Sequence, residues 1–230
     1  FSKPISLCFR VGLGAALLAA TAAAAQSAFP APVEKALAEA EAQDDYRVSY
    51  SMRFIWPDAE PVTARYDAAT ERWATLSGDP DALSGAGPKK FKTWKRVESK
   101  PGGLLYADYR SSLRDVTLVD ETDDALTYNF VSPQTPDSLE EAADVVETKL
   151  VIDKTDGRMS LYSVRALKPF KPNVASNLEE FEFTQTFARI DDDGPAVMTK
   201  TYWRAKGKRV FSSVDEEYTV EFFDFEPVTD

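Results

Sequence analysis

The chain contains no histidine and a single cysteine, Cys8. Without histidine, Ser-His-Asp and Cys-His catalytic arrangements are excluded, and zinc would have to be held by carboxylates alone, which is uncommon. The sequence also lacks the motifs S-x-x-K and G-x-S-x-G and a glycine-rich loop that cradles phosphates. We therefore expect no common hydrolase chemistry, no metal and no cofactor.

The first 28 residues have the layout of a secretory signal peptide. Lys3 and Arg10 precede an apolar run at 11–25, which ends in small residues. The run is too short and too rich in alanine to span a bilayer, which takes about 20 strongly apolar residues. Cleavage after Ala25 and cleavage after Ala28 both fit. We expect export to a bacterial periplasm and no integral membrane segment after cleavage.

Removal of residues 1–28 leaves 29–230, a length that suits a single domain with a sizeable core. Cys8 is removed with the signal and precedes its apolar run, so we expect neither a disulfide nor a lipidated cysteine in the mature protein. The loss of two positive charges takes the net charge from −11 to −13. Such an acidic chain argues against a nucleic-acid partner, whose binding needs a basic face.

Hydrophobic periodicity predicts one helix followed by many strands. Residues 32–43 space their apolar side chains as a helix does and are rich in alanine, glutamate and lysine. From Tyr46 to Phe54 the period is two, as in a strand with one buried face. The same period predicts further strands at 62–66, 72–76, 113–119, 126–131, 146–152, 159–167, 178–190, 196–204 and 214–225.

The connections between these strands are of two kinds. Residues 153–157, 191–195 and 206–208 place glycine between alternating segments and predict hairpins, which in succession form an antiparallel meander. Two longer connections predict inserted helices. One follows the breakers before Pro88 and runs to Ser99, and a short one falls within 132–144.

The predicted fold is mainly β, in the α+β class. It is a single curved antiparallel meander or half-barrel of about nine to eleven strands, since twist makes a sheet of that size curl or close. An N-terminal helix and one or two inserted helices accompany it. One face is rich in aromatic residues and lines either a filled core or a cavity for an apolar ligand. The residues predicted to bind that ligand are Phe181, Phe183, Phe187, Tyr218 and Phe222.

A basic segment stands out in this acidic chain. As an amphipathic helix it can contact anionic lipid or an acidic partner; alternatively, its aromatic residues dock on the sheet and its lysines face water. Weaker candidates for partner binding are Lys168, Lys171 and residues 206–209. The residues of the segment that we predict to bind a partner are Lys89, Lys90, Lys92, Trp94, Lys95 and Arg96.

Acidic clusters lie at predicted turns and strand ends, at 120–124, 179–182, 191–193 and 215–217. A glycosidase needs two carboxylates ~5–10 Å apart across a cleft, and sequence spacing alone does not establish that geometry. The cluster before Gly194 lacks the ligand spacing of a calcium-binding EF-hand loop. Solvated turns are the simpler interpretation, and a carboxylate-based hydrolase remains a third hypothesis.

The layout resembles the LolA-like periplasmic fold, a half-open barrel of lipoprotein carriers and RseB-type sensor domains. The resemblance covers residues ~30–230 and rests on a signal, one helix, a long meander and inserted helices. It implies a non-enzymatic carrier or sensor and supplies no catalytic residue. Several segments also resemble a group of uncharacterised exported proteins of alphaproteobacteria. They are residues 65–67, 72–76 with Gly78, 149–153 with Gly157, and 168–170.

Two main hypotheses of function follow. In the first, the protein is not an enzyme and binds an apolar ligand, a lipid or the acyl chains of a lipoprotein, in a cavity of the curved sheet. In the second, it is a periplasmic interaction or sensor module that uses the sheet edge or the basic segment 89–96. A filled sheet and a hollow one have the same sequence pattern, so the two remain open at this point.

Overall fold

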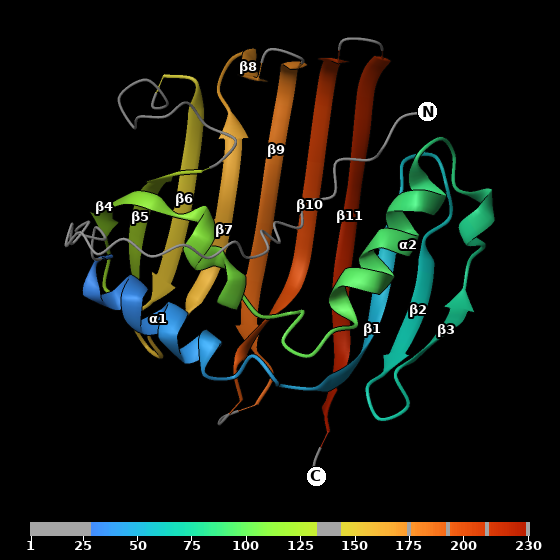
Figure 1. Cartoon of the computed structure of the whole chain (residues 1–230), viewed down its shortest axis with the longest axis horizontal. Helices are drawn as coiled ribbons and strands as arrows, with labels where there is room; N and C mark the ends of the chain where they lie inside the picture. The colour runs from blue at the N-terminus through green and yellow to red at the C-terminus, as the bar shows by residue number, and fades with distance from the viewer. Residues whose placement is uncertain (1–28, 133–143, 174–175, 192–193, 210–211, 229–230) are drawn as a thin grey trace, which may run out of the picture.

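The computed structural model describes residues 29–132, 144–173, 176–191, 194–209 and 212–228, and Figure 1 shows the arrangement of their elements. In these ranges the chain forms an open, curved sheet of eleven strands, accompanied by two α-helices and two short 3₁₀ helices. Each strand pairing is antiparallel. The prediction of a mainly β fold with one large antiparallel sheet is therefore confirmed.

The strand order is β3-β2-β1-β11-β10-β9-β7-β6-β5-β4, with β8 paired to β9. The first and last strands of the chain therefore pair in the interior of the sheet, nearer its β3 edge, where Val48 lies opposite Pro227. β3 and β4 form its two edges. The bounds are β1 Val48–Ile55, β2 Val62–Asp67, β3 Arg72–Ser77, β4 Arg114–Glu121, β5 Ala125–Val131, β6 Val146–Asp153, β7 Met159–Ala166, β8 Phe170–Asn173, β9 Ser176–Arg189, β10 Ala196–Arg209 and β11 Ser212–Pro227.

Both α-helices lie on the same face of the sheet (Figure 1). They are α1, Ala31–Glu41, and α2, Gly87–Glu98. Their bounds lie within a few residues of the helices predicted at 32–43 and from Pro88 to Ser99. The 3₁₀ helices are η1, Pro80–Ala82, and η2, Ala107–Ser112, which packs against α1. The short helix predicted within 132–144 falls almost wholly in 133–143, outside the described residues.

The two faces of the sheet differ in chemistry because successive side chains of a strand point to opposite sides. On the face toward the helices, here called the inner face, Phe54, Leu150 and Val220 are fully buried. On the other, outer face, Arg53 and Lys149 are exposed. The alternation in the sequence thus places the apolar core between the inner face and the helices.

The outer face carries a charge ladder that crosses five strands. The residues directly opposite one another in register are Glu147, Arg165, Glu182, Arg204 and Glu217, on β6, β7, β9, β10 and β11. Arg165 forms an ion pair with Glu147 at 2.7 Å. Opposite charges alternate along the row, and each such cross-strand pair contributes roughly 0.2–1 kcal/mol.

The hairpin predicted at residues 206–208 is wrong. These residues lie inside β10, which runs on to Arg209. Gly207 marks a register shift between β10 and β9 instead of a turn. A Cβ atom at this position would overlap the carbonyl oxygen of Asn177, so the glycine is required by the close approach of the neighbouring strand.

The edge strand β4 is irregular and exposed. Its register against β5 shifts twice, between Arg114 and Thr117 and again between Leu118 and Asp120. Leu118 and Val119 are each about half exposed, at 50% and 51%. β4 therefore presents apolar side chains at an edge whose backbone is bent by bulges.

Candidate functional site

The helices cover the inner face unevenly. Phe91 of α2 packs on Phe54, with 5.7 Å between ring centroids. On the same inner face, toward the β4 edge of the sheet, Tyr109 of η2 packs on Tyr162, with 4.8 Å between ring centroids. In Figure 1 the middle of β9 and β10 lies between these two covers, and neither α1 nor α2 crosses it.

Four aromatic side chains line this middle region and its border with α2, and we call them the aromatic strip: Phe181 and Phe183 of β9, Trp203 of β10, and Tyr218 of β11, which contacts Trp94 of α2. Ring centroids lie 5.4 Å apart for Phe181 and Trp203, 5.8 Å for Phe183 and Trp203, and 6.3 Å for Trp203 and Tyr218. Phe181 and Tyr218 are buried, whereas Phe183 and Trp203 are only partly buried. The strip is therefore a continuation of the core that remains in part accessible.

Two buried polar atoms lie in or beside the strip without a hydrogen-bond partner among the described residues, Nε1 of Trp203 and Oε1 of Gln185. Gln185 donates from Nε2 to Oγ1 of Thr201 at 3.3 Å. Register places Phe183 opposite Trp203 and Gln185 opposite Thr201, so the two polar side chains are diagonal neighbours. A buried polar atom left unpaired costs about 1–3 kcal/mol, so the strip has an unmet donor and an unmet acceptor.

The structure separates the five residues predicted to bind an apolar ligand. Phe181, Phe183 and Tyr218 meet in the strip. Phe187 is buried beneath Tyr106, at a centroid distance of 5.2 Å, and Phe222 is buried beneath Trp94, at 6.2 Å. These last two lie under the covers on either side of the strip.

Sequence reasoning missed Trp203 and Gln185. Trp203 lies in a predicted strand, and its period-two neighbours Thr201 and Ala205 are buried on the same inner face. The register between β9 and β10, which sets Trp203 opposite Phe183, includes a shift between Met198 and Lys200. That shift leaves no signal in the sequence.

The basic segment forms most of α2 and divides into two sets. Nζ of Lys90 binds Glu216 at 2.7 Å and lies 5.4 Å from the ring centroid of Trp203. Lys95 lies over Trp73 at 5.4 Å, and burial lowers its pKa. These two lysines, together with the partly buried Trp94, hold α2 on the sheet. The other three basic residues, Lys89, Lys92 and Arg96, are exposed.

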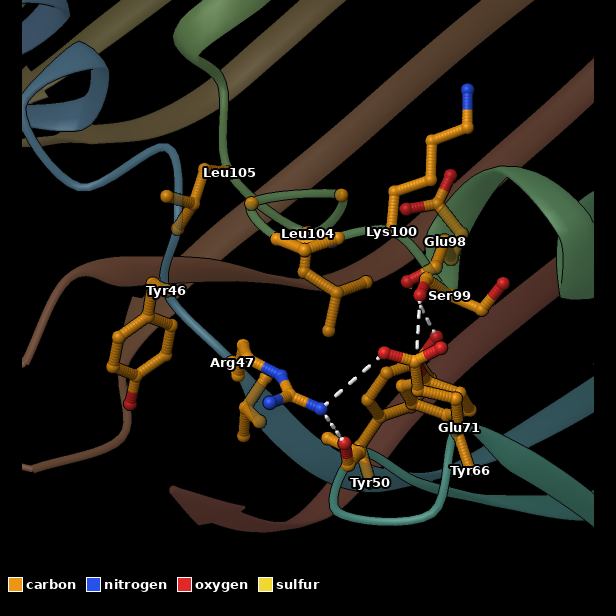
Figure 2. Close-up of a pocket in the computed structure, with 15 residues that line it drawn as sticks. Tyr46, Arg47, Tyr50, Tyr66, Glu71, Glu98, Ser99, Lys100, Leu104 and Leu105 are labelled. Atoms are coloured by element: carbon orange, nitrogen blue, oxygen red, sulfur yellow. Dashed lines mark hydrogen bonds and ion pairs between the residues drawn. The ribbon is translucent and has the colours of Figure 1, made fainter. Parts of the chain in front are cut away.

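A small pocket of about 20 Å³ lies at the C-terminal end of α2, and Figure 2 shows the residues that line it. The hydroxyl of Tyr50 donates to the carbonyl of Glu98 at 2.9 Å, and that of Tyr66 to the carbonyl of Ser99 at 2.8 Å. The Glu98 side chain is buried, its Oε2 has no partner within the described part of the chain, and burial raises its pKa to about 8. The pocket has room for about one water molecule, not for an acyl chain.

A larger hollow of about 560 Å³ lies against the charge ladder. Its lining includes Arg165, Glu182, Arg204 and Glu217 as well as Leu167. This charged lining and the small size of the first pocket mean that neither hollow matches the apolar cavity expected from the sequence. In the residues that the structure describes, no group of three His, Cys, Asp or Glu side chains is placed to hold a metal ion.

Comparisons with known proteins add little. No family model matches the chain, and no curated protein matches it. A solved structure, that of a LolA superfamily protein from Nitrosomonas europaea, matches with 12% sequence identity and a TM-score of 0.38, over 86% of this chain and 93% of that one. A match at this level carries no argument about ligand or activity. No helix in the described ranges combines the length and apolar character needed to cross a bilayer.

Proposed function

We propose that this protein is an exported, non-enzymatic binding protein for an apolar ligand that contains an acyl chain, and that the ligand lies on the aromatic strip. The observation that carries the proposal is the strip itself, where partly exposed Phe183 and Trp203 extend the core and two buried polar atoms have no hydrogen-bond partner among the described residues. Binding sites for apolar molecules combine an apolar lining with a few such polar groups.

The chemistry of the strip suggests how the ligand is held. An acyl chain on Phe183 and Trp203 would remove apolar surface from water, worth roughly 25 cal/mol per Å². Nε1 of Trp203 and Oε1 of Gln185 are buried, so the ligand reaches them only when neighbouring side chains move aside. A carbonyl oxygen at the head of the chain would then accept a hydrogen bond from Nε1 of Trp203, and an amide or hydroxyl group of the ligand would donate to Oε1 of Gln185. The site is thus an open surface between α2 and η2, not an enclosed cavity.

Titration of the mature chain, residues 29–230, with a fluorescent fatty acid tests the proposal. We expect saturable binding that weakens about tenfold in Phe183→Ser, because the strip loses one of its two partly exposed aromatic rings. Trp203→Phe keeps an aromatic ring and removes the donor, so we expect a loss of about fivefold.

The matched control is Phe223→Ser, a change of the same kind on the outer face, where Phe223 lies near Arg53. We expect it to leave fatty-acid binding within about twofold of the unaltered protein, with circular dichroism confirming that all variants fold. An unaltered protein that binds no fatty acid, or a Phe223→Ser loss as large as that of Phe183→Ser, would refute the proposal.

Export to the periplasm is part of the same proposal and rests on the signal-like segment 1–28. Mass spectrometry of the protein recovered from the periplasm gives the test, since cleavage after Ala25 or Ala28 predicts two distinct mature masses. Gentle purification followed by solvent extraction shows in the same experiment whether a lipid accompanies the protein. Recovery of the uncleaved chain from the cytoplasm would contradict export.

A further inference from the structure

The three exposed basic residues of α2 form a single stripe. Lys89, Lys92 and Arg96 are spaced i, i+3 and i+7, which places them on one face of a helix. Lys100, just beyond the end of α2, is also exposed and continues the same spacing. Phe91 and Glu98, on the opposite side of the helix, are buried. The stripe therefore points directly away from the sheet.

The charges of the stripe are uncompensated. Within the described ranges, none of its four side chains forms an ion pair, whereas Lys90 on the flank of the same helix binds Glu216. The neighbouring η1 has Asp79 at its N-cap and Asp81 in its first turn, and neither forms an ion pair with α2 in that part of the structure. A row of free positive charge on a chain of net charge −11 is a local feature, not a consequence of composition.

We propose that this stripe docks the protein on a membrane surface that contains anionic phospholipids. An anionic bilayer surface attracts exposed Lys and Arg without needing apolar contacts. A protein interface usually has an apolar centre, and here the aromatic residues of α2, Phe91 and Trp94, are turned toward the sheet. The stripe offers charge alone, which favours the lipid surface over a protein partner.

The position of α2 gives the docking a direction, and this part rests on the proposed function. α2 lies on the inner face over β1 and β11, next to the part of the sheet that carries the aromatic strip (Figure 1). A bilayer in contact with the stripe therefore faces the same side of the sheet as the strip. An acyl ligand would pass between the membrane and Trp203 with little exposure to water.

Sedimentation with lipid vesicles tests the docking. The mature protein is mixed with phosphatidylcholine vesicles containing one quarter phosphatidylglycerol, and with vesicles of phosphatidylcholine alone, at low ionic strength. We expect binding to the anionic vesicles only, and its loss at high salt, because screening weakens attraction between exposed charges. In K89Q/K92Q/R96Q we expect the partition coefficient to fall at least about tenfold.

The matched control is R72Q/R114Q/K200Q, which removes the same charge from exposed basic residues that also have no ion pair in the described part of the chain. We expect it to reduce vesicle binding less than about twofold. Equal losses in the two triple variants would overturn the proposal, as would an unaltered protein that ignores anionic vesicles. So would stripe-dependent cross-linking to an acidic protein in the absence of vesicle binding.

Fatty-acid binding in vesicle-free solution separates this proposal from the proposed function. We expect K89Q/K92Q/R96Q to bind the fatty acid as the unaltered protein does, because none of the three side chains belongs to the strip. A protein that binds anionic vesicles through the stripe but no fatty acid would retain the docking proposal and refute the ligand. A protein that binds the fatty acid but not the anionic vesicles would refute the docking proposal and retain the ligand.

Discussion

Glu98 is an uncommon residue for a buried position at the end of a helix. It is the last residue of α2, only 5% exposed, and its Oε2 has no partner in the described structure. Both burial and the negative end of a helix disfavour a charged carboxylate. Burial raises the pKa of Glu98 from 4.5 to about 8. Between these two pH values the folded protein therefore keeps a proton on Glu98 that the unfolded chain releases.

Stability should therefore fall as the pH rises. The contribution of the protonated Glu98 is fully present below pH 4.5 and is lost as the pH rises through about 8. Since one pKa unit corresponds to about 1.4 kcal/mol, the total is of the order of several kcal/mol. We expect Glu98→Gln to stabilise the protein at pH 8.5 and to change little at pH 5, as measured by urea denaturation.

The control for Glu98 is Glu71→Gln in the same pocket (Figure 2), where the carboxylate is exposed and pairs with Arg47 at 3.5 Å. We expect the fall in stability between pH 5 and 8.5 to persist in this variant, because Glu98 is unchanged. A Glu98→Gln protein with an unaltered slope between pH 5 and 8.5 would show that the buried carboxyl does not titrate as described.

Gly102 illustrates a second constraint at a single residue. Its φ is +65°, its amide donates to the carbonyl of Tyr46 at 2.9 Å, and a Cβ atom would overlap the carbonyl of Asp44. Gly85 has a similar φ of +56° with open space around it. We expect Gly85→Ala to cost about 1 kcal/mol, the backbone strain alone, and Gly102→Ala about 3 kcal/mol or more. Thermal denaturation of the two variants measures the difference, and equal losses would contradict the steric argument.

At the level of elements, α1 depends on one arginine. Arg110 of η2 donates to both carboxylate oxygens of Glu34, at 2.8 and 2.9 Å, and to Glu41 at 2.6 Å. These hydrogen bonds lower the pKa of Glu34 and join the first and last turns of α1 to η2. We expect Arg110→Gln to speed amide hydrogen exchange throughout α1 several-fold. Lys35→Gln removes only an exposed pair with Glu39 and serves as the control.

The charge ladder links neighbouring strands, as Arg110 links α1 to η2. Glu182 lies between Arg165 and Arg204 in register, so Glu182→Lys would set three positive charges side by side. We expect a loss of about 1 kcal/mol relative to Glu182→Gln at low ionic strength. The difference between the two variants should shrink in 0.5 M salt, since the charges lie at the surface. A difference that does not respond to salt would assign the effect to packing.

The elements also show how far sequence reasoning reaches. Ten of the strands were predicted because their apolar side chains alternate, and α2 was predicted because Pro88 follows glycine breakers. β8 was missed since four residues give too little periodicity. The placement of Trp203 beside Phe183 depends on a register shift between β9 and β10. The ion pair of Lys90 with Glu216 depends on the orientation of α2 on the sheet. These are tertiary facts that local pattern does not encode.

For the whole molecule, the decisive contact is the pairing of β1 with β11. Ile55 lies opposite Thr219, so the interior of the sheet joins residues far apart in the chain. No local signal predicts this pairing, and the sequence was consistent with a simple sequential meander. Such distant pairing slows folding, because the entropy of closing a long loop is lost before contacts compensate for it.

Truncation before Ser212 tests the role of β11. We expect it to abolish cooperative unfolding rather than leave a ten-stranded sheet, because β1 and β10 would both lose their neighbour and Val220 and Phe222 would leave the core. Urea denaturation followed by circular dichroism gives the answer. A truncated chain that still unfolds cooperatively would show that the two halves of the sheet are independently stable.

The irregular edge strand β4 has a consequence for crowded solutions. An incoming strand needs several consecutive hydrogen bonds at regular spacing, and the two bulges of β4 interrupt that spacing within eight residues. Leu118 and Val119 would otherwise make this edge a template for stacking one molecule on the next. The bends in β4 thus act as a barrier to fibre growth, allowing an open sheet to keep an unpaired edge in water.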